Sequence, residues 1–220
     1  MTKKILAEAL GALLLTACVI GSGIMAERLA GGNAALALLA NTAATVAVLA
    51  TLISTLGPVS GAHFNPVITA VAFYQRQIDA KTAAVYSAIQ FVACCAGAVL
   101  ANLMFELPPV QFSTHVRSGG AQWLSELVAT AGLVLVAFRS PSAEAAACRV
   151  SLWIGAAYWF TASTSFANPA ITIGRSLSDT FAGIRPADSP GFIGAQVAGA
   201  FAGVVLLRAL AARETGTRVT

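Results

Sequence analysis

The length of the uncharged stretches in this chain constrains its fold more than any other feature. A transmembrane helix needs about 20 mostly apolar residues, and a soluble domain carries about 25% charged residues. Here only 10% of the 220 residues are charged and 57% are hydrophobic. The chain is therefore predicted to be an all-α membrane protein with several spans. Five stretches of membrane length contain no Asp, Glu, Lys or Arg: Ala9–Ala26, Leu29–Gln75, Thr82–Phe105, Val150–Gly174 and Ser189–Leu207.

Six spans are predicted from the hydrophobic runs. The first begins after Lys3 and Lys4, as a cleaved signal peptide would, but Glu8 interrupts that pattern and equally apolar segments follow. We therefore interpret it as a retained span. The predicted spans cover about residues 5–26, 34–57, 80–105, 120–140, 146–163 and 190–211.

The basic residues indicate how the chain is oriented. They are scattered rather than clustered, which does not favour nucleic-acid binding. An excess of Lys and Arg marks the cytoplasmic side, so both termini are predicted to be cytoplasmic. Arg28, Arg117, Arg175 and Arg185 fall on one side. The other side holds nine residues: Lys3, Lys4, Arg76, Lys81, Arg139, Arg149, Arg208, Arg213 and Arg218.

Two phrases in the chain are near copies of each other. Ser60–Thr69 reads SGAHFNPVIT, and Ser163–Thr172 reads STSFANPAIT. Each half would contribute three spans, an odd number, so the second half must enter the bilayer from the opposite side. We predict an inverted three-helix repeat, residues 1–110 and 111–220. The similarity extends to polar residues at matching places, namely Glu8 with Glu126 and Gln90 with Gln196.

The Asn-Pro steps predict two short helices inside the membrane. Asn is a good N-cap and Pro is favoured in the first helical turn. Nine uncharged residues follow the first step before Arg76, about half the hydrocarbon thickness as a helix, and five follow the second step before Arg175. If both steps were ordinary turns, residues 29–75 would instead hold two full spans. The duplication favours two re-entrant half-helices, 65–75 and 168–178, beside the six transmembrane helices.

These motifs make the whole chain resemble the major intrinsic protein family of aquaporins and aquaglyceroporins. The resemblance implies a bacterial inner-membrane channel that forms a homotetramer, with one pore per subunit and no cofactor. Val67 departs from the usual alanine of the first box, and we expect a packing change there. The two boxes of the family correspond to Asn65, Pro66 and Val67, and to Asn168, Pro169 and Ala170.

The resemblance also implies a narrow selectivity filter. Ungapped spacing from each Asn assigns it to Thr45, Ala156, Ser165 and Ile171, where water-specific members have an aromatic residue, a histidine and an arginine. This set predicts a wide, uncharged filter. We expect the nearest cation, Arg175, to lie at the end of its half-helix, facing the polar interface or a loop.

Three further polar residues receive roles from the resemblance. Glu8 and Glu126 are predicted to brace the pore loops by accepting backbone hydrogen bonds. His63 is predicted to line the cytoplasmic half of the pore, with pH gating as an alternative. The four cysteines do not have metal-ligand spacing, and no metal site is predicted.

The predicted function is passive conduction of small neutral solutes through a pore. Glycerol, urea, arsenite and other metalloid hydroxides, and water are the expected solutes. The run from Phe166 to Ile184 resembles bacterial members associated with arsenic resistance. A water-selective channel is the near alternative. A coupled secondary transporter also uses inverted repeats, but it needs intramembrane ionisable residues, and only Glu8 and Glu126 qualify. No nucleophile, base and orienting group occur together as an enzyme requires.

Overall fold

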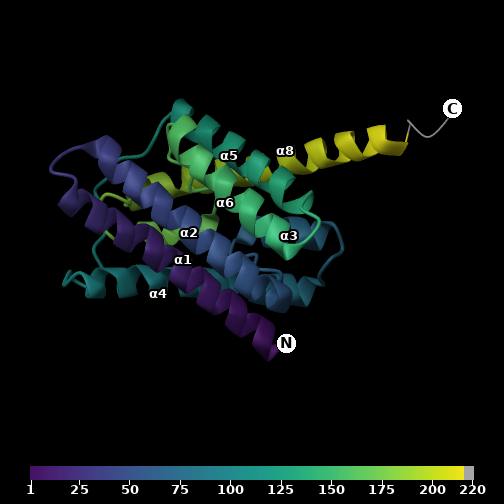
Figure 1. The fold of residues 1–220 in the computed structure, drawn as a ribbon, viewed down its shortest axis with the longest axis horizontal. Coiled ribbons are helices and arrows are strands. Elements are labelled where there is room, and N and C mark those ends of the chain that lie inside the picture. The colour runs from purple at the N-terminus through teal and green to yellow at the C-terminus, as the bar shows by residue number, and fades with distance from the viewer. Residues whose placement is uncertain (216–220) are drawn as a thin grey trace.

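The computed structural model describes residues 1–215, with side chains described as far as Ala211, and these residues form helices and loops without a strand. The long helices run side by side as a bundle, and α8 ends at the end of the bundle where α1 begins (Figure 1). Two short helices and one 3-10 turn, η1, lie among them: α3 Pro66–Tyr74, α7 Pro169–Arg175 and η1 Pro186–Asp188. The long helices are α1 Thr2–Leu29, α2 Ala34–Ser60, α4 Ala80–Met104, α5 Gly120–Phe138, α6 Ala143–Phe160 and α8 Ser189–Thr215.

Side-chain caps begin several of the helices. The Asn33 side chain accepts from the Leu36 amide at 3.1 Å, and the Asp79 carboxylate accepts from the Thr82 amide at 2.7 Å. These bonds satisfy amides that have no partner within the helix. Gly61, at φ 93°, ends α2 in a left-handed conformation that glycine adopts without a Cβ clash. The chain then turns back into the bundle toward α3.

Two pairs of helices approach closely through glycines. Gly97 of α4 packs against the Leu13 carbonyl of α1, and Gly199 of α8 packs against the Leu127 carbonyl of α5. A Cβ at either glycine would collide with the facing carbonyl oxygen. Small residues at such crossings let helices pack tightly in a membrane, where the hydrophobic effect between helices is absent.

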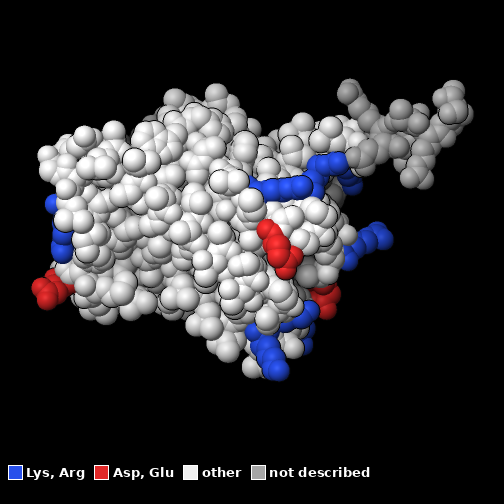
Figure 2. Space-filling model, viewed as in Figure 1, with Lys and Arg blue, Asp and Glu red and all other residues white. Residues whose placement is uncertain are grey.

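The surface has the charge distribution of a membrane-spanning bundle. Lys, Arg, Asp and Glu side chains gather at the two ends, and a broad uncharged surface separates them (Figure 2). By length and hydropathy, five helical segments of the described chain are able to cross a membrane: α1, α2, α4, α5 and Pro186–Ala211. α6 is less apolar because Glu144 and Arg149 lie in its first two turns.

The predicted all-α fold, with long helices and two half-helices, is confirmed. α3 and α7 begin directly after Asn65 and Asn168, as the Asn-Pro steps predict. The helix ends differ from prediction by a few residues. α6 begins three residues earlier, and α7 stops at Arg175 rather than at residue 178. The division at residue 110 stays a prediction. The side chains of Arg213 and Arg218, counted in the charge bias, lie outside the described residues.

The α5–α8 crossing yields a stability prediction. Gly199→Ala places a methyl group against the Leu127 carbonyl, whereas nothing lies within 4 Å of a Cβ at Gly194 on the same helix. Overpacking costs about 1–3 kcal/mol, and each kcal/mol lowers Tm by about 2–4 °C in a chain of this size. Thermal unfolding in detergent should therefore give a lower Tm for G199A than for G194A. Equal Tm values would contradict the close packing.

Candidate functional site

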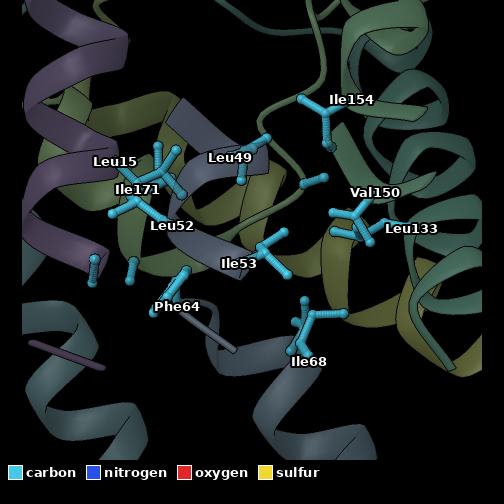
Figure 3. Close-up of a cluster of buried hydrophobic side chains, with 14 of the residues drawn as sticks. Leu15, Leu49, Leu52, Ile53, Phe64, Ile68, Leu133, Val150, Ile154 and Ile171 are labelled. Carbon is cyan, nitrogen blue, oxygen red and sulfur yellow. The ribbon is translucent and has the colours of Figure 1, made fainter. Parts of the chain in front are cut away.

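A cavity of about 310 Å³ lies where the two half-helices begin. Most of its wall is apolar, and the buried side chains come from α1, α2, α5, α6 and both half-helices (Figure 3). Ile53 of α2 and Val150 of α6 both line the space. Polar groups enter this wall from the segments that precede α3 and α7. The cavity is therefore amphipathic, with a long apolar surface and a short line of hydrogen-bonding groups.

The two asparagines join the half-helices reciprocally. The Asn65 side-chain amide donates to the Ala167 carbonyl at 2.7 Å, and the Asn168 amide donates to the Phe64 carbonyl at 2.9 Å. Each side-chain oxygen also caps its own helix, as Asn65 does by accepting from the Val67 amide at 3.0 Å. Each amide group has a second N–H. Both asparagines line the cavity, so this second donor is available to a molecule inside it.

Glu8 braces the first pore loop. Its carboxylate accepts from the backbone amides of His63 at 3.0 Å and Phe64 at 2.8 Å. The Ser60 hydroxyl donates to it at 2.6 Å, and the Gln90 side chain donates at 2.8 Å. Glu8 is fully buried and does not line the cavity. Four donors surround one carboxylate, as its four lone-pair positions allow.

Glu126 repeats the arrangement in the second half. It is fully buried and accepts from the amides of Phe166 and Ala167, both at 2.8 Å. The Gln196 side chain donates to it at 2.7 Å and to the Thr172 hydroxyl at 2.9 Å. Both pore loops are thus tied to a long helix by two backbone amides and a glutamine side chain, with Ser60 as a further donor in the first half only. The structure places both glutamates where bracing was predicted.

The braced loops are conformationally unusual. Ala62 and Phe64 have φ near 49° and 48°, and Ser165 and Ala167 have φ of 51° and 47°. Left-handed conformations of residues other than glycine cost about 1–3 kcal/mol each and persist only where the surroundings enforce them. The carboxylate bonds of Glu8 and Glu126 provide that enforcement. Non-helical backbone at this depth requires protein or water around it, and here both the bundle and the cavity are adjacent.

The other box residues have packing positions. Val67 is buried in the main apolar cluster, together with Ala170. Pro66 and Pro169 occupy the first position of their helices. None of these four residues lines the cavity, so the asparagines are the members of the boxes that face it.

Three of the four predicted filter residues come together at the cavity: Thr45, Ser165 and Ile171. Thr45 donates to the Asn41 carbonyl at 2.9 Å, so its hydroxyl accepts from the Tyr158 hydroxyl 3.2 Å away. Thr45 therefore has no donor left for a solute. The Ser165 hydroxyl is different, because it is buried and has no hydrogen-bond partner among the described residues.

The assignment of Ala156 to the filter needs correction. Ala156 is exposed on the outer face of α6, beside Leu152 and Trp153, and does not line the cavity. Ile154 and Tyr158 line it instead. Each residue turns a helix by about 100°, so an assignment that slips by one or two residues points to the wrong face. The i, i+4 spacing of Val150, Ile154 and Tyr158 is the sequence signal for the correct face.

Arg175 is the last residue of α7 and contacts the loop that follows, which agrees with the prediction. It is also 2% exposed and lines the cavity, which was not predicted. Its guanidinium Cζ lies 3.3 Å from the centroid of the Phe166 ring, and its Nε donates to the Ala182 carbonyl. The cavity lining therefore includes a cation, and Tyr158 and Phe166 are among its aromatic residues. The filter that was predicted to be uncharged thus has an arginine in the same passage.

A second buried arginine, Arg117, lies nearby in the loop between α4 and α5. Its Nε donates to the Gly183 carbonyl at 2.7 Å, and its two terminal nitrogens donate to the carbonyls of Ser163 and Phe181 at 3.4 and 3.3 Å. Burial lowers the pKa of Arg117 to about 10, so it remains protonated at neutral pH. Arg117 does not line the cavity, and its bonds tie the loop before α5 to the loop after α7.

Comparisons with known proteins agree with this fold. A family model described as Major intrinsic protein matches residues 1–162. The chain belongs to the major intrinsic protein family. It is 50% identical over 210 residues to Aquaglyceroporin AqpS of Rhizobium meliloti (strain 1021), across 94% of this chain and 90% of that protein. Aquaporin-5 of Rattus norvegicus is 33% identical over 100 residues, which cover 42% of this chain and 37% of that one.

A solved structure of the aquaglyceroporin from Plasmodium falciparum has the same fold. The TM-score is 0.69 at 20% identity, with 93% of each chain covered. This major intrinsic protein is therefore a membrane channel for small solutes and not an enzyme.

His63 also lines the cavity of this major intrinsic protein. Its Nδ1 lies 3.1 Å from the Thr69 hydroxyl, and its ring packs edge-on against Tyr86 with centroids 5.6 Å apart. The structure thus places His63 in the cavity wall beside the first pore loop, and pH gating stays a hypothesis. No group of three potential metal-ligating residues occurs in the described part of the chain.

The glutamate brace can be tested by Glu126→Gln. The amide NH2 would face backbone N–H groups, and each unpaired buried donor costs about 1–3 kcal/mol. We expect E126Q to lower the Tm and to reduce the permeability of reconstituted vesicles measured by stopped-flow light scattering. Glu144→Gln is the control, because Glu144 is an exposed residue near the start of α6. If E126Q matched E144Q in both measurements, the brace would not support the pore.

Proposed function

We propose that this major intrinsic protein conducts small neutral solutes passively: glycerol, urea, arsenite and related metalloid hydroxides, and water. The observation that carries the proposal is that Ser165, whose buried hydroxyl has no hydrogen-bond partner among the described residues, lines the cavity together with Ile171. Buried polar groups normally have partners, so a buried hydroxyl without one suggests that a passing molecule supplies it. A solute that has a carbon skeleton and hydroxyl groups can contact both the apolar and the polar parts of this wall.

The polarity of the cavity wall supports hydroxylated solutes as well as water. The volume of about 310 Å³ has room for several small molecules, since one water occupies roughly 30 Å³ in the liquid. Leu49, Ile53 and Ile154 offer apolar contact, while the second N–H of Asn65 and of Asn168 replaces part of the solute's hydration. Channel selectivity depends on diameter and on the donors and acceptors that line the pore.

A water-selective channel is the second candidate. The hydrogen bond between Tyr158 and Thr45 places an aromatic ring in the cavity wall, and Arg175 adds a cation. Both features favour a narrower passage than the wide filter predicted from the sequence. Ile171 opposes this candidate, because it leaves an apolar residue directly after the second box.

Coupled transport is disfavoured by the use of the carboxylates. Glu8 and Glu126 accept bonds from backbone and side-chain donors and do not line the cavity. No carboxylate among the described residues lines it, so a coupling cation has no anionic site there. In a swelling assay, uptake against a concentration gradient that depends on an ion gradient would refute the channel proposal.

The setting that we propose is a bacterial inner membrane with both termini in the cytoplasm. The bacterial origin of the 50% identical relative and the excess of Lys and Arg at one side support it. We also propose a homotetramer and an inverted repeat of residues 1–110 and 111–220. The matched bonds of Glu8 and Glu126 support the repeat.

Ile171→Arg tests the proposed solute range. The added side chain narrows the passage beside the second box, so glycerol and arsenite permeability should fall by about tenfold, equivalent to about 1.4 kcal/mol of barrier, and water permeability should fall less. Stopped-flow measurements on proteoliposomes would compare the three. Ile171→Leu, which conserves volume, is the control. Equal loss for all three permeants would show that Ile171 does not select among them.

Ser165→Ala tests the unpartnered hydroxyl. It removes no bond within the described protein, so we expect the Tm to stay within about 1 °C of wild type, as for a substitution without a structural role. Glycerol permeability should fall while water permeability is maintained, because a polyol loses one of few hydrogen-bonding partners. A large fall in Tm, or unchanged glycerol flux, would refute the role of Ser165.

A further inference from the structure

The positive charge in this cavity lies one helical turn beyond the residue that directly follows the second box. Ile171 occupies the position directly after the second box, and Arg175 follows four residues later on the same face of α7. Four residues advance an α-helix by about 6 Å. Ile171 and Arg175 both line the cavity, so the cation belongs to the same passage, further from the asparagines. Ala182, which binds Arg175, lies beside Gly23 in the second half of α1.

The guanidinium of Arg175 is held in one orientation. Phe166 lies against its face at 3.3 Å, and the Ala182 carbonyl accepts from its Nε. Phe166 is in turn fixed by Phe192, with an edge-on contact of 5.0 Å between ring centroids. A long side chain that is stacked and bonded at Nε has few other rotamers available, so the position of its charge is defined.

The terminal nitrogens of Arg175 have no hydrogen-bond partner among the described residues, although its side chain is almost fully buried. Arg117 shows what a purely structural arginine does in this region, because all three of its guanidinium nitrogens donate to carbonyls. An arginine has five N–H groups, and Arg175 uses one of them. Four donors therefore remain at the wall of a cavity.

Arg175 has no ion-pair partner among the described residues, and the buried carboxylate of Glu126 attracts its charge only through space. Arg117 adds a second positive charge on the same aromatic ring, 5.2 Å from the Phe166 centroid. In a narrow passage with apolar walls, an unpaired charge acts on an ion far more strongly than it would in water. A cation entering the cavity would meet this field before it reached the asparagines.

We propose that Arg175, stacked on Phe166, is the specificity-determining residue at this end of the channel, where it repels cations, hydronium included, and donates hydrogen bonds to oxygens of neutral solutes. This proposal rests on the proposed function, solute conduction. It names Arg175 as the residue that lets neutral solutes pass while ions are excluded. Ile171 then provides width beside the second box, and Arg175 provides charge a turn away. The residue that sets the width of the pore and the residue that carries the charge thus lie at different positions along it. An arginine at position 171 would determine both.

The test measures ion leak and solute flux in the same proteoliposomes. A pH-sensitive dye trapped in the vesicles reports proton entry under a potassium diffusion potential, and stopped-flow scattering reports glycerol entry. Arg175→Gln removes the charge, so proton leak should rise by about tenfold or more. Glycerol permeability should fall, because donors to its oxygens are lost. Arg185→Gln is the matched control, since Arg185 is an exposed arginine paired with Asp188 outside the cavity.

Two further variants separate charge from folding. Arg175→Lys keeps the charge and loses the planar stack, so its proton leak should remain below that of R175Q by the same large factor. The double variant I171R/R175Q restores a cation to the passage next to the box and should recover proton exclusion while glycerol flux stays low. A residue with a structural role alone would not be rescued in this way. If R175Q does not purify as a folded protein, Arg175→Met, whose unbranched chain still covers Phe166, replaces it.

Failure of the Arg175 proposal can be distinguished from failure of the proposed function. Wild-type vesicles that conduct no glycerol would defeat the proposed function. Wild-type vesicles that conduct glycerol, combined with the same proton leak in R175Q, R175K and R185Q, would overturn the role of Arg175 and leave the proposed function standing. A leak in R175Q that I171R does not reduce would also overturn it.

Discussion

The carboxylates of Glu8 and Glu126 hold the two pore loops in conformations that these sequences would not otherwise adopt. Each accepts two consecutive backbone amides inside the bundle, where unpaired amides are costly because no bulk water can replace the lost partner. The loops contain non-glycine residues with left-handed φ, including Phe64 and Ala167. Those same two residues provide the carbonyls that accept from Asn168 and Asn65. The brace therefore positions the junction, and the junction positions the cavity.

The cavity wall combines two kinds of surface that follow from different parts of the chain. Long helices contribute the apolar side, because a helix in a membrane bundle can present Leu, Ile and Val in any direction at little cost. The loops contribute the polar side, since irregular backbone and the residues at its ends bring polar groups to the cavity wall. Ser165 and Arg175 are the clearest cases. A solute with hydroxyl groups on a carbon skeleton meets both surfaces at once.

Sequence reasoning succeeded where local chemistry decides the structure and failed where helix rotation and loop packing decide it. The starts of α3 and α7 follow from Asn-Pro steps, because N-capping by Asn and the fixed φ of Pro act within a few residues. Ala156 was assigned by counting from Asn168, but a count along the chain does not define the rotation of α6 about its axis. Arg175 was expected at the end of its half-helix, facing the polar interface or a loop, and it does contact the loop after α7 through the Ala182 carbonyl. The sequence did not indicate that Arg175 also lines the cavity with its guanidinium stacked on Phe166.

The sequence by itself determined that this chain crosses a membrane several times, that it contains two half-helices, and that the residue after the second box is not an arginine. These conclusions depend on composition, spacing and capping, which are properties of short segments. Only the tertiary structure decided which face of α6 reaches the cavity, that the Thr45 hydroxyl is already bonded to Asn41 and Tyr158, and that a buried arginine lines the passage. Each of these depends on how helices rotate and loops fold over one another, and that is decided by packing among residues far apart in the chain.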